Sequence, residues 1–286
     1  MAAEVQSFFD PATGSLTHLV HAGRGSASAI IDPVLDFDPV AARTSTRSVD
    51  HVLEFAQRHD LSVDWILETH AHADHLSSAD YVRQETGARI AIGHRIVEVL
   101  EAFRGIYDWP ADVTVGTCRF DRLVSEGEEF RIGQLRIRVL CVPGHTPASV
   151  AYAVDDCVFV GDLVLRPEIG SARCDFPGGD PRALYRSIRR IMALPPSTRL
   201  FLCHDYPEAG DEPRIVTTVE EQRQRNVHIR DGIGEEEFVA LRHARDATLP
   251  PPRLIIPSIQ CNVLGCRLPS PSANGRRYLN MPLDTF

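Results

Sequence analysis

The chain has 286 residues, of which 43% are hydrophobic and 24% are charged, and its formal net charge at pH 7 is −9. This composition suits one soluble globular domain, while the acidic balance argues against general binding to nucleic acid or to a membrane surface, because phosphate groups require a basic face. No run approaches the ~20 apolar residues that span a bilayer, and residues 1–10 lack the pattern of a secretory signal.

The first third of the chain predicts alternating strands and helices. Apolar residues that alternate or cluster indicate strands over 16–21, 28–34 and 63–68. Gly23–Gly25 is expected to form the hairpin turn between the first two strands. Apolar residues at helical spacing indicate helices over 48–59 and 76–86. We expect Ser48 to cap the first helix and Gly87 to end the second.

Segment 95–109 has helical spacing and carries three aromatic residues that look exposed, at Phe103, Tyr107 and Trp109. Two interpretations stay open at this point. The segment is either a lid or subunit contact, or a helix that packs on the sheet.

The rest of the chain continues the alternation. Short strands are expected within 124–160, including 135–142 and 157–160, and again over 200–203. Helices are expected over 181–193, 218–227 and 235–248. Pro250–Pro252 should end the last helix, so that 250–286 forms an irregular tail wrapping a single domain of residues 1–286.

The cysteines indicate a reducing compartment. They are odd in number and form no CxxC pair, at positions 118, 141, 157, 174, 203, 261 and 266. Several lie in apolar runs, where a free thiol packs as a small hydrophobic group. We therefore expect a cytoplasmic protein. Cys174 is expected to pack in the core rather than act as a nucleophile. Cys261 and Cys266 could form a metal-binding pair, but we expect them not to bind a metal, because the sequence contains no matching second pair.

The most informative motif is Thr69-His70-Ala71-His72-Ala73-Asp74-His75, directly after an apolar run. Burying so many polar groups is costly unless they are paired or bind a cation. Imidazole and carboxylate together suit zinc, iron or manganese. The alternative is a solvated, histidine-rich loop.

Three isolated groups follow short apolar runs further along the chain. They are His145 in Pro143–Pro147, Asp162 in Val160-Gly161-Asp162, and His204 in Leu202–Tyr206. Each alone is weak, since a lone histidine is more often a hydrogen-bonded structural residue and an aspartate after glycine is more often in a turn. Together with the histidine cluster, they predict metal ligands at strand ends.

The order HxHxDH, Gly-His-Thr, Gly-Asp and a strand-end histidine resembles the metallo-β-lactamase superfamily over roughly residues 15–230. Within this superfamily, four short motifs resemble those of the persulfide dioxygenase branch. They are Thr69–His75, Pro143–Pro147, Gly170–Phe176 and Cys203–Tyr206. The tail from Leu254 to Gly275 resembles the bacterial form called β-lactamase-like hydrolase. The resemblance implies an α/β fold, an αββα sandwich.

The resemblance further implies a single Fe(2+) held by His70, His145 and Asp162, which would be the catalytic centre. Two histidines and one carboxylate leave positions open for substrate and O₂. The remaining candidates would then orient ligands and water, namely His72, Asp74, His75 and His204. The sequence also allows a dinuclear centre with two Zn or mixed Fe/Zn. His70, His72 and His145 would then form one site, Asp74, His75 and His204 would form the second, and Asp162 would bridge the two.

The expected substrates are glutathione persulfide and O₂, and the expected products are sulfite and glutathione. Guanidinium groups match carboxylates well, so Arg173 and Arg214, with Tyr206, are candidates for substrate binding. For Arg214, an ion pair among Glu208, Asp211 and Glu212 is the competing interpretation. Arg173 is alternatively a buried partner of an acid, and Tyr206 part of a turn.

Three other functions remain open. The first is a dinuclear thioester hydrolase of the glyoxalase II kind, although the chain lacks a basic C-terminal helical domain. The second is a lactonase or another hydrolase, and the third is a non-catalytic binder of metal or persulfide. The family resemblance also suggests a homodimer. The acidic net charge predicts no nucleic-acid or membrane partner.

Overall fold

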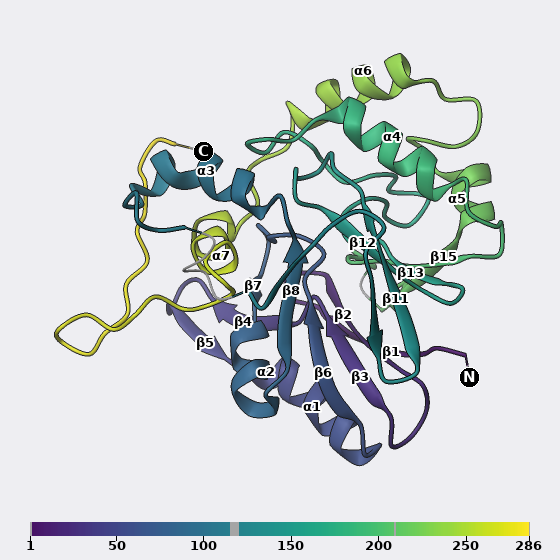
Figure 1. Ribbon diagram of the computed structural model, residues 1–286. Coiled ribbons are helices and arrows are strands. Elements are labelled where there is room, and N and C mark those ends of the chain that lie inside the picture. Colours follow the sequence, from purple (N-terminus) through teal and green to yellow (C-terminus); the bar gives the residue numbers. More distant parts are fainter. Residues whose placement is uncertain (1, 115–119, 209, 286) are drawn as a thin grey trace.

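A computed structural model describes residues 2–114, 120–208 and 210–285 (Figure 1). Its strands are β1 Glu4–Asp10, β2 Ser15–His21, β3 Ala27–Ile31, β4 Val34–Asp38, β5 Arg43–Ser45, β6 Ser62–Leu67, β7 Leu76–Ser77, β8 Arg89–Gly93, β9 Arg122–Val124, β10 Glu129–Ile132, β11 Leu135–Cys141, β12 Val150–Val154, β13 Cys157–Phe159, β14 Arg199–Phe201 and β15 Val216–Thr218. Its helices are α1 Arg47–Arg58, α2 Ala79–Thr86, α3 Ile96–Tyr107, α4 Pro181–Ile191, α5 Val219–Arg225, α6 Glu235–Asp246 and α7 Ile255–Asn262.

Two six-stranded sheets form the centre of the molecule, in the orders β1-β2-β3-β6-β8-β9 and β10-β11-β12-β13-β14-β15. Their facing sides share one hydrophobic core, in which Leu67 of the first sheet clusters with Tyr152 and Phe159 of the second. A third, three-stranded sheet has the order β5-β4-β7.

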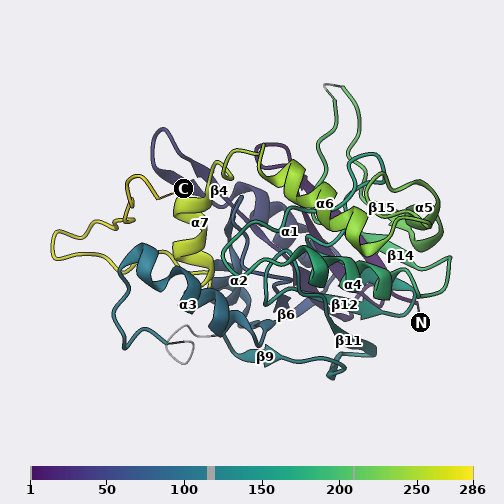
Figure 2. The same cartoon turned by 90° about the horizontal axis from the view of Figure 1, so that it is seen from above.

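Helices cover the outer faces of both large sheets. Val52 of α1 and Val82 of α2 pack with Ile66 of the first sheet. On the other side, α4 and α6 lie side by side (Figure 2), and their Ile188 and Phe238 share a core with β13. The layers are therefore helix, sheet, sheet, helix, which confirms the predicted αββα sandwich.

Several predicted boundaries are wrong. Helix α1 begins at Arg47, and Ser48 does not cap it but donates a hydrogen bond to Asp36 Oδ1 at 2.7 Å. Residues 76–77 form β7 rather than the start of a helix, because they pair with β4. Strands β1, β4, β5, β8 and β15 were not predicted, since short or edge strands depend on partners far away in the sequence.

The segment around α3 is a packed helix and not an exposed lid. Phe103 and Tyr107 are both 2% exposed, and they cluster with Ile255 and Ile259 of α7. The Tyr107 hydroxyl donates to the carbonyl of Ile255 at 3.3 Å. The interpretation of these aromatic residues as exposed was therefore wrong.

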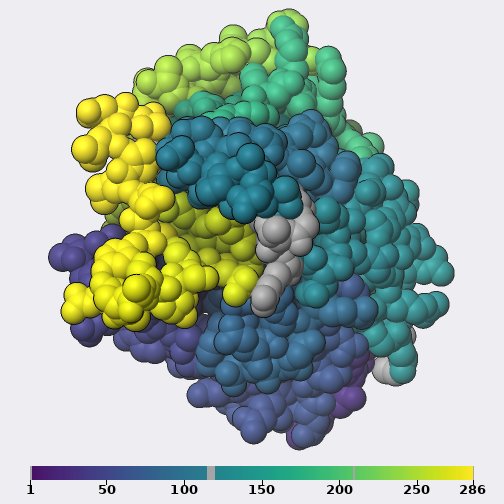
Figure 3. All heavy atoms as spheres, turned by 60° about the vertical axis from the view of Figure 1, so that its left-hand side comes forward, coloured from purple at the N-terminus to yellow at the C-terminus, as the bar shows by residue number. Residues whose placement is uncertain are grey.

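The segment 250–286 is not wholly irregular, because it contains α7. Five consecutive residues of α7, 258–262, are buried. Beyond it the chain lies against the side of the molecule that carries α3 and α7 (Figure 3), where the Gln260 side chain bonds the backbone of Asn280 twice. In the described ranges, every helix is too short or too polar to cross a bilayer.

Candidate metal centre

Strand direction brings the predicted ligands to one place. Strands β3 and β6 are parallel neighbours, so the residues that follow them, Asp32 and the loop with His70, lie at the same edge. In the second sheet β11 and β13 run in one direction, because each is antiparallel to β12, and β14 is parallel to β13. The loops after these three strands carry His145, Asp162 and His204.

The first group at this edge consists of His70, His145 and Asp162. Asp162 Oδ2 lies 4.0 Å from Nε2 of His70 and 3.6 Å from Nε2 of His145. The two imidazole rings are perpendicular, with centroids 5.0 Å apart. Both histidines therefore direct Nε2 at one carboxylate, in the two-histidine-one-carboxylate arrangement that the resemblance implied.

Hydrogen bonds at Nδ1 set the tautomer of both histidines. His145 Nδ1 lies 2.6 Å from the carbonyl oxygen of Arg173, which only accepts. Thr69 Oγ1 donates to Asp32 Oδ2 at 2.8 Å, so its oxygen accepts from His70 Nδ1 at 3.0 Å. Each ring thus carries its proton on Nδ1 and leaves the Nε2 lone pair available to a metal.

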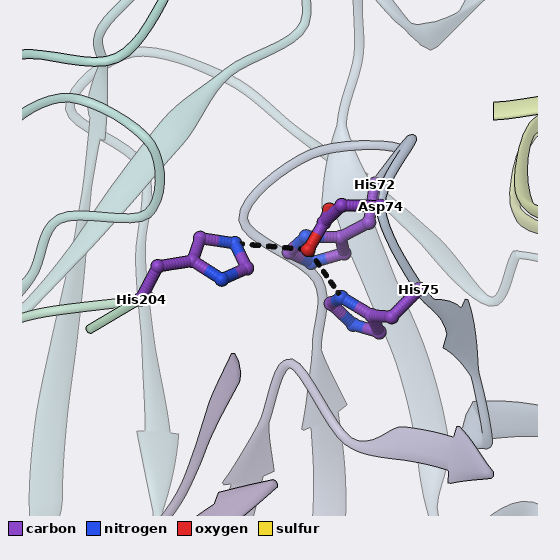
Figure 4. Close-up of side chains that lie close together, drawn as sticks. All are labelled: His72, Asp74, His75 and His204. Carbon is purple, nitrogen blue, oxygen red and sulfur yellow. Dashed lines mark hydrogen bonds and ion pairs between the residues drawn. The ribbon is translucent and has the colours of Figure 1, made fainter. Parts of the chain in front are cut away.

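The second group consists of His72, Asp74, His75 and His204 (Figure 4). Asp74 Oδ2 lies 3.3 Å from His75 Nδ1 and 3.4 Å from His204 Nε2. The other oxygen of Asp162 lies 3.3 Å from His204 Nε2. Asp162 therefore stands between the two groups, where a bridging ligand would lie if both held a metal.

Ser15, at the start of β2, is a site residue that sequence reasoning missed. Its buried hydroxyl oxygen lies 3.1 Å from His75 Nδ1 and 3.4 Å from His204 Nδ1. It donates to Asp74 Oδ2 at 3.4 Å. No local pattern marks this serine, because its role depends on residues 60 and 189 positions away.

Two buried acids, Asp32 and Glu68, were also missed. His72 Nε2 lies 3.0 Å from Asp32 Oδ1 and 3.6 Å from Glu68 Oε2. Asp32 also accepts from the backbone N–H of Thr69 at 2.7 Å. A usable signal exists, because each acid follows directly on an apolar strand, as His145 and Asp162 do nearby.

Electrostatics favour the metal-binding forms of His70, His72 and Asp74, whereas the carboxylates of Asp74 and Asp162 raise the pKa of His204 against its burial. Burial holds the pKa values of His70 and His72 well below the usual histidine value, so both rings are neutral. Against its burial, the imidazoles of His204 and His75 hold the pKa of Asp74 well below its usual range. Neutral imidazole and ionised carboxylate are the forms that coordinate metals.

The fit to a cation follows from buried atoms that have no hydrogen-bond partner among the described residues. Among them are Nε2 of His70, Nδ1 of His72 and Nε2 of His75. Unpaired buried polar atoms are costly. A metal ion would satisfy them.

A cavity of about 590 Å³ opens beside the cluster, lined by Asp74, His145, Asp162 and His204. Arg173 and Tyr206 line it as well. The Arg173 guanidinium pairs with Asp175 at 2.7 Å, so Arg173 is the partner of an acid, but the pair is not the buried one that was expected, because Asp175 is exposed. Tyr206 stacks parallel to His204, with ring centroids 6.2 Å apart.

The structure does not bring Arg214 to the cavity. Its side chain pairs with Glu221, and it lies 3.7 Å from Glu168. The predicted role in substrate binding is therefore not supported. The acids expected as its alternative partners, Glu208, Asp211 and Glu212, are not its ion-pair partners either.

The cysteines of the described residues are free. The Cys174 thiol lies 3.5 Å from Asp246 Oδ2, and burial raises its pKa to about 12, which suits packing and not nucleophilic attack. Cys261 and Cys266 belong to none of the metal-ligand groups found among the described residues. Cys118 lies outside them.

Comparison with known proteins gives the wider context. A family model described as the metallo-beta-lactamase superfamily matches residues 12–204. The beta-lactamase hydrolase-like protein of Xylella fastidiosa is 48% identical over 99% of this chain, which spans only 65% of that protein's length. Glyoxylase B2 of Dictyostelium discoideum is 42% identical over 90% of this chain and 88% of its own.

The mitochondrial persulfide dioxygenase ETHE1 of Homo sapiens is 25% identical over 94% of this chain and 91% of its own. Among solved structures, ETHE1 from Myxococcus xanthus matches with a TM-score of 0.74 and 28% identity. The match covers 92% of this chain and all of that one.

Proposed function

Because the chain belongs to the metallo-β-lactamase superfamily, we propose that it is an iron-dependent persulfide dioxygenase that oxidises glutathione persulfide. The overall reaction is one persulfide, one O₂ and one water giving one glutathione, one sulfite and two protons. The observation that carries the proposal is the convergence of His70, His145 and Asp162, with Nε2 of both histidines aimed at one carboxylate.

His70, His145 and Asp162 would hold Fe(II). When bound there, the iron supplies the activation of O₂ and the contact between O₂ and the terminal sulfur. The protein's own part is to hold the two imidazoles in one tautomer, through Thr69 and the Arg173 carbonyl. Asp74 and His204 line the cavity beside this group and can orient the water that the reaction consumes.

Similarity to two proteins supports the proposal. The persulfide dioxygenase of Homo sapiens aligns over nearly the whole chain, and the ETHE1 structure from Myxococcus xanthus matches over 92% of it. Both are more distant in sequence than Glyoxylase B2.

A dinuclear thioester hydrolase is the second candidate, and a specific observation favours it. His72, Asp74, His75 and His204 form a second ligand group that Asp162 reaches with its other oxygen. Two cations there would be bridged by Asp162 and would activate a water for attack on a thioester.

Two assays separate these functions. The protein is reconstituted anaerobically with Fe(II) and given glutathione persulfide in an oxygen electrode, and separately it is loaded with zinc and given S-lactoylglutathione. Oxygen uptake with sulfite release supports the dioxygenase. Thioester turnover without oxygen uptake supports the hydrolase, and persulfide binding without either reaction supports a non-catalytic binder.

We also propose that the enzyme works in the cytoplasm as a homodimer. The free cysteines of the described residues favour a reducing compartment. The dimer rests on the family resemblance alone, and light scattering of the purified protein tests it.

A further inference from the structure

The cavity beside the metal centre is lined by acids and by arginines. Asp74 and Asp162 line it within the two candidate ligand groups, and their side chains are 26% and 14% exposed. Four arginines also line the cavity, namely Arg173, Arg242, Arg245 and Arg253. The chain as a whole is acidic, with a net charge of −9, so this concentration of guanidinium groups is local.

Two of the four arginines already have acidic partners. Arg173 pairs with Asp175, and the buried Arg242 pairs with Asp246. Arg245 and Arg253 form no ion pair with any residue in the described ranges, and both are exposed. The Arg253 guanidinium donates a hydrogen bond of 3.2 Å to the carbonyl of Ala12, which also lines the cavity.

Apolar side chains also line the cavity. Leu165, Ile169, Phe176 and Leu249 line the same cavity. Arg245 lies in the last turn of α6, and Arg253 lies in the connection from α6 to α7. The unpaired cations therefore come from the C-terminal part of the chain, whereas the metal-binding candidates come from strand-end loops of the two sheets.

We propose that Arg245 and Arg253 bind the carboxylates of the carrier thiol, and so select an anionic low-molecular-weight thiol such as glutathione over neutral or cationic ones. This inference rests on the proposed function, which places the sulfur of the substrate at the metal centre. The acids of the metal centre repel a carboxylate, whereas the exposed guanidinium groups of Arg245 and Arg253 can form bidentate hydrogen bonds with one. The substrate therefore enters with its sulfur inward and its carboxylates outward.

The pair takes over the role that sequence reasoning gave to Arg173 and Arg214. Arg173 uses its guanidinium on Asp175, and Arg214 lies away from the cavity beside Glu221. Because exposed ion pairs are weak singly, two guanidinium groups acting on two carboxylates explain selection better than either alone.

The test is calorimetric binding of reduced glutathione and of its diethyl ester to the full chain, with Arg245→Gln, Arg253→Gln and the double variant. The matched control is Arg230→Gln, since Arg230 is also exposed and without an ion pair in the described ranges but does not line the cavity. We expect each single variant to weaken glutathione binding about threefold to tenfold, and the double variant more. The diethyl ester should bind weakly to the wild type and be unaffected by the substitutions.

Kinetics gives a second readout. The substitutions should raise KM for glutathione persulfide and leave kcat nearly unchanged, because they remove binding remote from the reacting sulfur. Equal affinity of the wild type for glutathione and its diethyl ester, or equal losses in Arg230→Gln and Arg245→Gln, would overturn the inference.

A failure of the proposed function can be distinguished from a failure of this inference. If the protein takes up no oxygen but hydrolyses S-lactoylglutathione, the dioxygenase proposal fails. The preference for glutathione over its ester, and its loss in the arginine variants, would still establish the carboxylate site.

Discussion

The Nδ1 atom of His145 lies 2.6 Å from the main-chain oxygen of Arg173, so a candidate metal ligand is oriented by the segment that follows β13. Helix α6 holds that segment in place. Asp246 accepts from the backbone N–H of Cys174 at 3.1 Å, and Arg242 donates to the carbonyl of Ser171 at 3.1 Å. The C-terminal part of the chain thus supports the metal centre through buried hydrogen bonds.

Replacing Arg242 by Met should destabilise the protein. Arg242 is 1% exposed and Asp246 is 5% exposed, so the substitution leaves a buried carboxylate without its partner. Breaking such a pair typically costs about 3–5 kcal/mol. Urea unfolding measures the loss, and the double variant Arg242→Met/Asp246→Leu should recover part of it. A single variant as stable as the wild type would show that the pair does not matter.

Gly161→Ala should loosen the loop that carries His70. A Cβ at Gly161 would lie 2.7 Å from Thr69 Oγ1, and the residue has a φ of +53°. Gly127→Ala is the matched control, because its φ is +72° but its Cβ would meet nothing within 4 Å. We expect Gly127→Ala to lose about 1 kcal/mol of unfolding free energy from backbone strain. Gly161→Ala should lose more and also bind Fe(II) more weakly, as competition with a chelator would show.

Acid should destabilise the apoprotein partly through His228. Burial, with Arg242 nearby, lowers the pKa of His228 from 6.5 to about 4. Because the unfolded chain binds this proton first, stability that is complete above pH 6.5 falls as the pH drops towards 4. Thermal unfolding of metal-free wild type and His228→Gln between these values measures the contribution. The variant should show a shallower decline of Tm, and parallel curves would exclude His228 as a source.

Ser15→Ala tests the role of the second ligand group. The substitution removes a hydroxyl that contacts His75, His204 and Asp74. If that group only orients water, the variant should retain one iron per chain and lose oxygen uptake about tenfold to a hundredfold, as other losses of supporting contacts do. If the group holds a metal, metal analysis of the variant should instead show less metal per chain than in the wild type.

Much of the fold was predictable because its periodic patterns are local. The strands near 16–21 and 63–68, the helices near 48–59 and 235–248, and the order of ligand candidates all follow from runs of neighbouring residues. Helix α7 was missed, because it is short and lies between a run of prolines and a polar tail. Its burial against α3 and β7 stabilises it, and that packing is not visible locally.

The candidate site likewise contains residues that the sequence predicted and residues that it did not. Residues His70 to His75 were recognisable because several ligand types lie within one short motif. Asp32 and Glu68 were missed although each follows directly on an apolar strand. Ser15 was not recognisable, since it contributes through partners brought close by the sheets. Arg214 was wrongly expected to bind the substrate. Its position after the Cys203–Tyr206 motif did not reveal that its side chain would pair with Glu221.

The most direct test of the central claim is the metal content of the protein after anaerobic Fe(II) loading and desalting, for the wild type and His145→Ala. The account predicts one iron per wild-type chain and none retained in the variant, because the substitution removes one of the three proposed ligands, His70, His145 and Asp162. Two metals per wild-type chain, or iron retained in full by His145→Ala, would contradict it.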